Sequence, residues 1–428
     1  MIPYKNELFE APVTGMTTMG YGVARHPGGQ AVFVHGGVTG DVAGIRVIKA
    51  GGVTVGRVEK LISSSPFRED NACPSKRCGG CSYGAVTFGY EQQLKRETVV
   101  MALKKQHVEA DVSECVTDGR RERYRNKVCV PVSGEKYGYY ARHSHELADC
   151  SGCVLAPEIF GEIAESCVSL GLPLRHVCVR TGEATGETML YPVLSRRPHE
   201  SEKKRLLSLA EKFPAISSVV CNINTKDTNV ILGDESEVIL GRDAVRDFIL
   251  GCEFEISHRS FYQVNRGVTE LLYGRAAEIV RRSGAKKVAD LFCGAGTIGI
   301  CCAKAAPGIS VTGTEIEPAA VENARENARR NGVENVSFTC GSADSVPQGT
   351  ELVITDPPRK GLSPALISSI ISSEAETLVY VSCNPDTIAR DAAEIIKGGF
   401  ELKSVTPFNM FPRTGSTEAV AVFCRKNI

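Results

Sequence analysis

The segment LVYVSCNPDTIAR, residues 378–390, reads as a short apolar strand followed by the start of a helix. Its first four residues are apolar, as expected of a buried parallel strand. Asn384 and Pro385 favour the N-cap and the first turn of a helix. Cys383 is therefore predicted to lie in a strand-to-helix turn, where the unpaired N–H groups of the helix would stabilise a thiolate and lower the cysteine pKa. The position suits a nucleophile, and the alternative is a small buried side chain.

The composition is that of a soluble globular protein, with 42% hydrophobic and 23% charged residues. A chain of 428 residues is long enough for two or three domains. The N-terminus lacks a signal-peptide pattern, and no run of about 18 or more apolar residues is present. We expect a monomeric cytoplasmic protein without a membrane partner. Seventeen cysteines in such a chain argue against a disulfide framework, so closely spaced ones indicate a metal or cluster and the others core packing.

The formal net charge is zero, which argues against a nucleic-acid partner. Basic residues nevertheless outnumber acidic ones in residues 1–150. They are densest in one short segment, which contains Arg120, Arg121, Arg123, Arg125 and Lys127. This segment is interpreted as a phosphate-contact patch, and the alternative is a solvated charged face.

Residues 3–62 contain short alternating strands separated by glycine-containing turns, a pattern typical of a small OB-like β-barrel. Such barrels often hold single-stranded nucleic acid, although a purely structural role is possible. The rest of the region before residue 254 alternates helical and strand patterns, which predicts an α+β domain. Aromatic residues between 124 and 140 could stack on bases or could pack at a sheet edge.

Three cysteines, Cys73, Cys78 and Cys81, lie within one glycine-containing loop, CPSKRCGGC. Such crowding requires a cation or cluster to hold the thiolates together. Cys150 and Cys153 are the candidates for a fourth ligand. Three close cysteines and one distant cysteine are more typical of a 4Fe-4S cluster than of zinc, which commonly uses two separated pairs.

The C-terminal part repeats strand, glycine-rich turn and helix from about residue 255. Gly294, Gly296 and Gly299 form a G-x-G-x-x-G turn after the apolar strand KVADLF. Glu315 ends the next strand, where a carboxylate can accept hydrogen bonds from a ribose diol. This pattern predicts a Rossmann-like fold but does not separate NAD from S-adenosylmethionine.

The end of the fourth strand favours S-adenosylmethionine. Its Asp-Pro-Pro sequence, residues 356–358, resembles motif IV of class I methyltransferases, and dehydrogenases lack it. Together with HRSFYQVN (258–265), DLFCGAGT (290–297) and SCNP (382–385), it resembles the RNA uracil-5-methyltransferase family, in particular its 23S rRNA enzymes. The resemblance covers nearly the whole chain. Residues 20–41 resemble a TRAM domain, a small RNA-binding barrel, and the cysteine loop resembles the family's cluster loop, with four rather than five residues between its first two cysteines.

The resemblance implies three domains: a TRAM barrel over residues 1–62, a central domain with the iron–sulfur loop over 63–254 and a methyltransferase domain over 255–428. It further implies roles for individual residues. The implied cofactor contacts are Gln263, Phe292, Glu315 and Asp356. The implied nucleophile is Cys383 and the implied base Glu418. The implied cluster ligands are Cys73, Cys78, Cys81 and Cys153, the last preferred over Cys150.

The chemistry explains why a cysteine and a base are both needed. Carbon-5 of uracil is a poor nucleophile until a thiolate adds to carbon-6, and a base must then remove the carbon-5 proton. In the methyltransferase topology the last strand is antiparallel, which predicts that Glu418 and Cys383 share one rim of the sheet.

The first interpretation is therefore methylation of uridine in 23S rRNA, and the second is methylation of tRNA. An iron–sulfur RNA-binding protein with an inactive methyltransferase domain is a further alternative. Methylation of an exocyclic amine is disfavoured, because such enzymes have an aromatic residue after the prolines, where this chain has Arg359.

Overall fold

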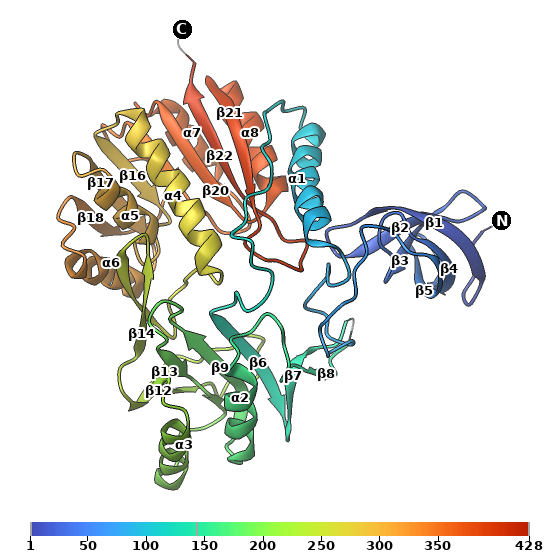
Figure 1. The fold of residues 1–428 in the computed structure, drawn as a ribbon. Coiled ribbons are helices and arrows are strands. Elements are labelled where there is room, and N and C mark those ends of the chain that lie inside the picture. Colours follow the sequence, from blue (N-terminus) through green and yellow to red (C-terminus); the bar gives the residue numbers. More distant parts are fainter. Residues whose placement is uncertain (1, 143, 427–428) are drawn as a thin grey trace.

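The computed structural model describes residues 2–142 and 144–426 (Figure 1). A small β-barrel projects from the N-terminal side, a helix-flanked sheet forms the C-terminal part, and a second sheet lies below both in the view of Figure 1. No helix among the described residues is both long and apolar enough to cross a membrane.

The N-terminal strands form a closed barrel in the order β1-β2-β3-β5-β4. The strands are β1 (Leu8–Met16), β2 (Tyr21–Arg25), β3 (Ala31–His35), β4 (Val42–Lys49) and β5 (Thr54–Ser63). Burial alternates along β1 to β3, so the apolar residues of each strand fill the barrel interior. This confirms the small β-barrel that the sequence predicted, and the barrel has five strands.

Helix α1 (Phe88–Lys105) follows the cysteine loop and belongs to the C-terminal core rather than to the sheet below it. Val99 and Leu103 pack in the same apolar cluster as residues of α8 (Pro385–Lys397) and of β21 (Phe400–Phe408). A segment that the sequence assigned to the central domain therefore packs against the C-terminal sheet, from which it is far removed in sequence.

The central domain is built on a mixed sheet, ordered β10-β12-β11-β9-β6-β7-β8, with β13 paired to β12. Helices α2 (Phe160–Ser169) and α3 (Glu200–Lys212) contribute to one apolar cluster with its strands. The strands are β6 (Lys127–Ser133), β7 (Lys136–Tyr140), β8 (Leu147–Asp149), β9 (Leu174–Thr181), β10 (Thr188–Leu190), β11 (Val193–Leu194), β12 (Ile216–Ile223) and β13 (Glu235–Leu240).

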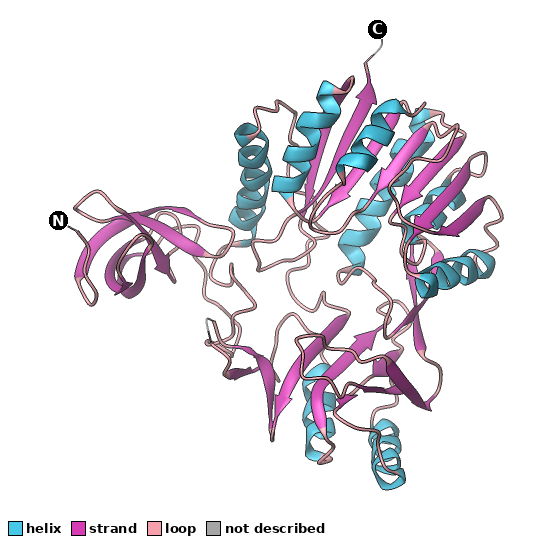
Figure 2. Ribbon diagram, turned by 180° about the vertical axis from the view of Figure 1, so that it is seen from behind, coloured by secondary structure: helices cyan, strands magenta, loops and turns pink. Residues whose placement is uncertain are grey.

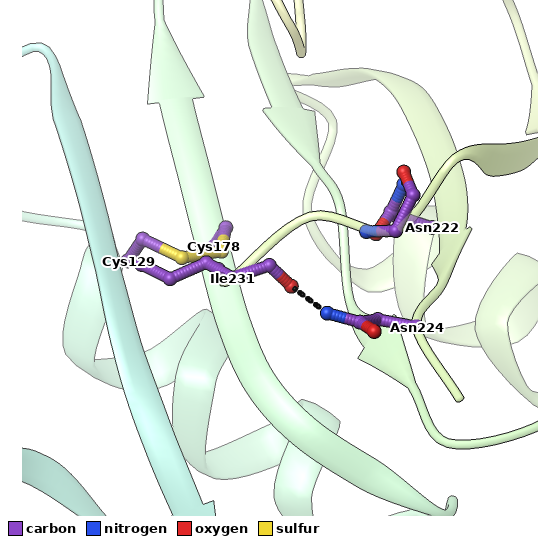
Figure 3. The surroundings of a disulfide bond; sticks show 6 residues. Cys129, Cys178, Asn222, Asn224 and Ile231 are labelled. Atoms are coloured by element: carbon purple, nitrogen blue, oxygen red, sulfur yellow. Dashed lines mark hydrogen bonds between the residues drawn. A yellow bond between two sulfur atoms is a disulfide. The ribbon is translucent and has the colours of Figure 1, made fainter. Parts of the chain in front are cut away.

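One pair of cysteines in this sheet departs from the expectation that cysteines outside the loop only pack in cores. Cys129 of β6 lies opposite Cys178 of β9, and the two form a disulfide (Figure 3). Nothing in the sequence predicted this disulfide, because only the pairing of the two strands brings the cysteines together.

The C-terminal sheet has the order β18-β17-β16-β19-β20-β22-β21, and only β22 runs antiparallel to its neighbours (Figure 2). Its strands are β16 (Lys287–Leu291), β17 (Ser310–Glu315), β18 (Val336–Cys340), β19 (Leu352–Thr355), β20 (Thr377–Ser382), β21 and β22 (Glu418–Arg425). The remaining helices are α4 (Arg266–Ser283), α5 (Thr297–Ala305), α6 (Pro318–Arg330) and α7 (Pro364–Ser372). A hairpin of β14 (Ala244–Ile249) and β15 (Cys252–Ser257) precedes them. The predicted methyltransferase-like α/β fold is confirmed.

Candidate active site

Cys383 lies in the turn between β20 and α8, as the sequence predicted. The side chain of Asn384 caps the helix by accepting a hydrogen bond from the N–H of Asp386 at 3.2 Å. Pro385 occupies the first turn, where its missing N–H costs nothing. The cysteine is thus held by a rigid strand on one side and a capped helix on the other.

The expected direction of the Cys383 pKa was wrong. Burial raises the pKa of this thiol, and the negative charge of Glu418 raises it further. A hydrogen bond with Arg359 and the positive charge of that guanidinium act in the opposite direction. Burial and a nearby carboxylate therefore oppose formation of the thiolate in the folded protein, and the guanidinium of Arg359 favours it.

Glu418 begins β22 next to the cysteine. Ala419 pairs with Ser382 across the antiparallel strands, so the residues that follow Ser382 and precede Ala419 lie at the same rim. Glu418 is only 2% exposed. Burial raises its pKa well above the ordinary value, and the charge of Asp356 adds to the rise, whereas Arg359 opposes it.

The four predicted cofactor residues lie along the same rim of the sheet or next to it. Glu315, at the end of β17, accepts hydrogen bonds from the N–H groups of Gly294 at 3.1 Å and of Glu317 at 2.9 Å. Asp356 follows β19, and burial raises its pKa to about 7.

The two other predicted contacts lie at bends of the chain. Phe292 follows β16 with a φ of 63°, in the left-handed region that non-glycine residues seldom adopt. Such a conformation is often found at functional sites. Gln263 is 5% exposed, and its carbonyl accepts a hydrogen bond from the side chain of Asn126 at 2.8 Å. The central domain thereby fixes the backbone of one predicted cofactor contact.

Asp290 and Arg359 are residues of the site to which sequence reasoning gave no role. Asp290 accepts a hydrogen bond from the N–H of Gly299 at 2.9 Å, and its second oxygen has no hydrogen-bond partner among the described residues. Burial raises its pKa to about 7. Their positions in the sequence could have marked both as residues of the site, since Asp290 precedes the glycine turn and Arg359 follows the two prolines.

A hollow of about 320 Å³ opens beside Cys383. It is lined by Thr18, Thr98, Arg359, Cys383, Asn384, Pro385, Asp386, Gly415, Ser416 and Thr417. Its volume is at the small end of ligand pockets, which start at about 300 Å³. The thiol of Cys383, the guanidinium of Arg359 and several hydroxyl groups line this hollow. Such groups suit the binding of a small polar ring.

Comparison with known proteins identifies the family. Residues 348–426 match the model of tRNA (uracil-5-)-methyltransferases, and residues 269–380 match that of the methyltransferase small domain. An RNA methyltransferase of Halalkalibacterium halodurans, described as uncharacterized, is 37% identical over 99% of this chain and 98% of its own length. Another, from Bacillus cereus, is 36% identical over 97% of each chain.

The chain belongs to the RNA uracil-5-methyltransferase family.

A solved structure of this family has the same fold. The tRNA (uracil-54, C5)-methyltransferase of Pyrococcus abyssi, in complex with S-adenosyl-L-homocysteine, matches with a TM-score of 0.79. The match covers 97% of this chain and 100% of that chain at 24% identity.

The cysteines of the loop and of the 150–153 turn surround one cavity of this methyltransferase, about 690 Å³ in volume. The cavity is lined by Cys73, Cys78, Cys81, Cys150 and Cys153. Burial raises the pKa of Cys81 to about 12, and the negative charges of the other thiolates add to the rise. Within residues 2–142 and 144–426, however, no three His, Cys, Asp or Glu side chains are grouped as ligands of a metal ion.

The basic segment 120–127 of the methyltransferase is not the free phosphate patch that the sequence suggested. Arg120 and Arg121 form ion pairs with carboxylates, and Arg123 donates hydrogen bonds to two backbone carbonyls. Arg125 lines the cysteine cavity. Lys127 is half-buried, and desolvation lowers its pKa to about 8. The density of basic residues in the sequence predicted more free positive surface than the fold leaves, because most of these side chains have partners inside the protein.

The aromatic residues between 124 and 140 include side chains that are buried in the fold and one that is exposed. Tyr137 is buried and donates a hydrogen bond to the carbonyl of Gly161 at 3.2 Å. Tyr140 is 50% exposed, with its ring 6.0 Å from that of His145. Only the second is accessible for stacking.

Proposed function

We propose that this protein transfers a methyl group from S-adenosylmethionine to carbon-5 of a uridine in RNA through a covalent bond between Cys383 and the base. The observation that carries the proposal is the meeting of Cys383, Glu418, Asp356 and Arg359 at one rim of the sheet. A nucleophile, a buried carboxylate and a cation next to both are what this reaction requires.

Cys383 performs the first step. Its thiolate adds to carbon-6 of uracil, and the electron pair of the C5–C6 double bond moves to the carbonyl oxygen at carbon-4, which gives an enolate. Arg359 favours the thiolate, because its positive charge opposes the effects of burial and of Glu418 on the Cys383 pKa. Carbon-5 of the enolate then attacks the methyl group, and the sulfonium sulfur departs with the bonding pair.

Glu418 performs the last step. It removes the proton from carbon-5, the C5–C6 double bond reforms, and the thiolate of Cys383 leaves carbon-6. A raised pKa makes Glu418 a stronger base than an exposed glutamate, provided that it has lost its proton. Arg359 favours the ionised form, so the same guanidinium supports both catalytic groups.

We propose that Gln263, Phe292, Glu315 and Asp356 bind S-adenosylmethionine, which supplies the methyl group. Phe292, Glu315 and Asp356 end or directly follow strands of the C-terminal sheet at this rim, where Rossmann-like folds bind their ligands, and Gln263 lies in the segment before α4. The carboxylate of Glu315 is already oriented by the N–H groups of Gly294 and Glu317, which leaves its position fixed before the cofactor arrives.

For the four cysteines Cys73, Cys78, Cys81 and Cys153 we propose a 4Fe-4S cluster. Their convergence on one cavity supports it. So do the raised pKa values of Cys78 and Cys81, which burial and the neighbouring cysteines both cause, because thiolates held together in a buried site need a positively charged group between them. A cluster of four iron ions is larger than a single ion and accepts ligands that lie further apart. Cys150 lines the same cavity and is the alternative fourth ligand.

We propose 23S rRNA as the substrate, since the barrel and the cysteine loop resemble those of the rRNA enzymes. Transfer RNA is the second candidate, because the matching family model and the Pyrococcus abyssi protein are both named for tRNA. Purified protein should be incubated with S-adenosylmethionine and with unmodified transcripts of each RNA. We expect 5-methyluridine in 23S rRNA alone. Its appearance only in tRNA would reverse the assignment, and its absence from both would refute the proposed activity.

A further inference from the structure

The loop between β1 and β2 brings the barrel into the catalytic pocket. Thr18 of this loop lines the hollow that also contains Cys383 and Arg359. The backbones touch, since a Cβ atom added at Gly415 would lie only 1.9 Å from the carbonyl oxygen of Thr18. Part of the pocket wall is therefore supplied by the N-terminal barrel.

The loop is held firmly at its second end. Gly20 has a φ of 79°, and a Cβ atom there would lie 2.1 Å from the carbonyl oxygen of Ser82. The hydroxyl of Ser82 in turn accepts a hydrogen bond from the N–H of Gly415 at 2.9 Å. The barrel loop, the cysteine loop and the loop before Glu418 thus meet at one junction.

Met19 lies between these two fixed contacts and is 66% exposed. Because Thr18 lines the pocket, this anchored loop presents an apolar side chain directly beside it, and an apolar partner would remove that surface from water. The adjacent pocket indicates what that partner is. An enzyme that modifies a base must draw it out of the stack, and proteins that disturb stacking often insert apolar side chains, including Met, between neighbouring bases.

We propose that Met19 packs against the nucleobase next to the target uridine and takes the place of the uridine in the stack, while Thr18 walls the pocket that the uridine enters. This inference rests on the proposed function. According to this inference, the barrel helps to select the target uridine at the reaction site, in addition to binding the RNA backbone.

The test compares Met19→Ala with Leu8→Ala. Leu8 is also exposed, at 56%, and begins the strand that precedes the Met19 loop. With a 23S rRNA transcript as substrate, we expect Met19→Ala to lower kcat/KM at least tenfold and Leu8→Ala to lower it less than twofold. Affinity for S-adenosylmethionine and the melting temperature should be unchanged in both.

A fluorescent base gives the second measurement. The transcript fragment carries 2-aminopurine next to the methylated uridine, and its fluorescence reports the loss of stacking. Wild-type protein should change the fluorescence on binding, and Met19→Ala should abolish most of that change. Equal behaviour of the two variants, or a slower Met19→Ala enzyme with the full fluorescence change, would overturn the inference. Wild-type protein that methylates no RNA would instead overturn the proposed function.

Discussion

A buried ion pair on α1 is predicted to hold the loop that leads to Glu418. Lys95 and Glu91 have no exposed side-chain surface, and their charged atoms lie 3.1 Å apart. The ammonium group also donates hydrogen bonds to the side chain of Asn409 and, at 2.9 Å, to the carbonyl of Phe411. Glu91 accepts hydrogen bonds at 3.0 Å from the side chain of Asn409 and from the N–H of Arg413.

Replacing Lys95 with methionine should destabilise the protein strongly. Removal of one partner of a buried pair costs about 3–5 kcal/mol when the other charge stays buried without compensation, and Arg121, 3.7 Å from Glu91, should offset part of this loss. Each kcal/mol shifts the melting temperature of a domain of 150–250 residues by about 2–4 °C, so a fall on the order of 10 °C is expected. The double variant Glu91→Gln, Lys95→Met leaves no isolated charge and should recover part of the loss.

Thermal unfolding followed by circular dichroism measures the effect, since the chain has no tryptophan for fluorescence. The rate of covalent bond formation with RNA, measured well below the melting temperature, shows whether the loop before Glu418 has moved. A Lys95→Met protein that melts within 2 °C of the wild type would refute the argument, given the roughly 10 °C expected. So would a double variant whose loss equals the sum of the two single losses.

Three further predictions follow from the site. Arg359→Met should raise the Cys383 pKa further, so the rate of adduct formation should fall most at neutral pH and recover as the pH rises; a loss independent of pH would contradict this role. Anaerobically purified protein should be brown with bound iron, and Cys81→Ala should lose the colour; colourless protein with stoichiometric zinc would exclude the 4Fe-4S assignment. Deletion of residues 1–62 should weaken RNA binding without weakening S-adenosylmethionine binding; equal loss of both would show that the barrel supports the cofactor site.

Local features of the sequence predicted much of the site. The turn at Cys383 and the glycine turn at residues 294–299 could be predicted because each is specified by consecutive residues: an apolar strand, a helix cap and the glycines themselves. The place of Glu418 at the rim followed from the antiparallel direction expected of the last strand, which the structure has.

Features that depend on distant contacts could not be predicted in this way. The Cys383 pKa depends on a carboxylate and a guanidinium that reach the thiol only in the folded protein. The buried pair of Glu91 and Lys95 looks like an ordinary helical ion pair in sequence, and its role depends on Asn409, far along the chain. Thr18 carries no signal at all, because only the docking of the barrel places it beside the pocket.

The order of the chemical steps can be tested with Glu418→Gln. Glutamine keeps the size of the side chain but cannot remove the carbon-5 proton, and loss of the negative charge lowers rather than raises the Cys383 pKa. The thiol should therefore add to uracil and the methyl group should be transferred, but the enzyme should stay bonded to the product.

The most direct measurement mixes Glu418→Gln protein with substrate RNA and S-adenosylmethionine carrying a labelled methyl group, and separates the mixture by denaturing electrophoresis. We expect a labelled protein–RNA band, which Cys383→Ala should not give. Normal turnover by Glu418→Gln, or methylation by Cys383→Ala, would contradict the covalent mechanism.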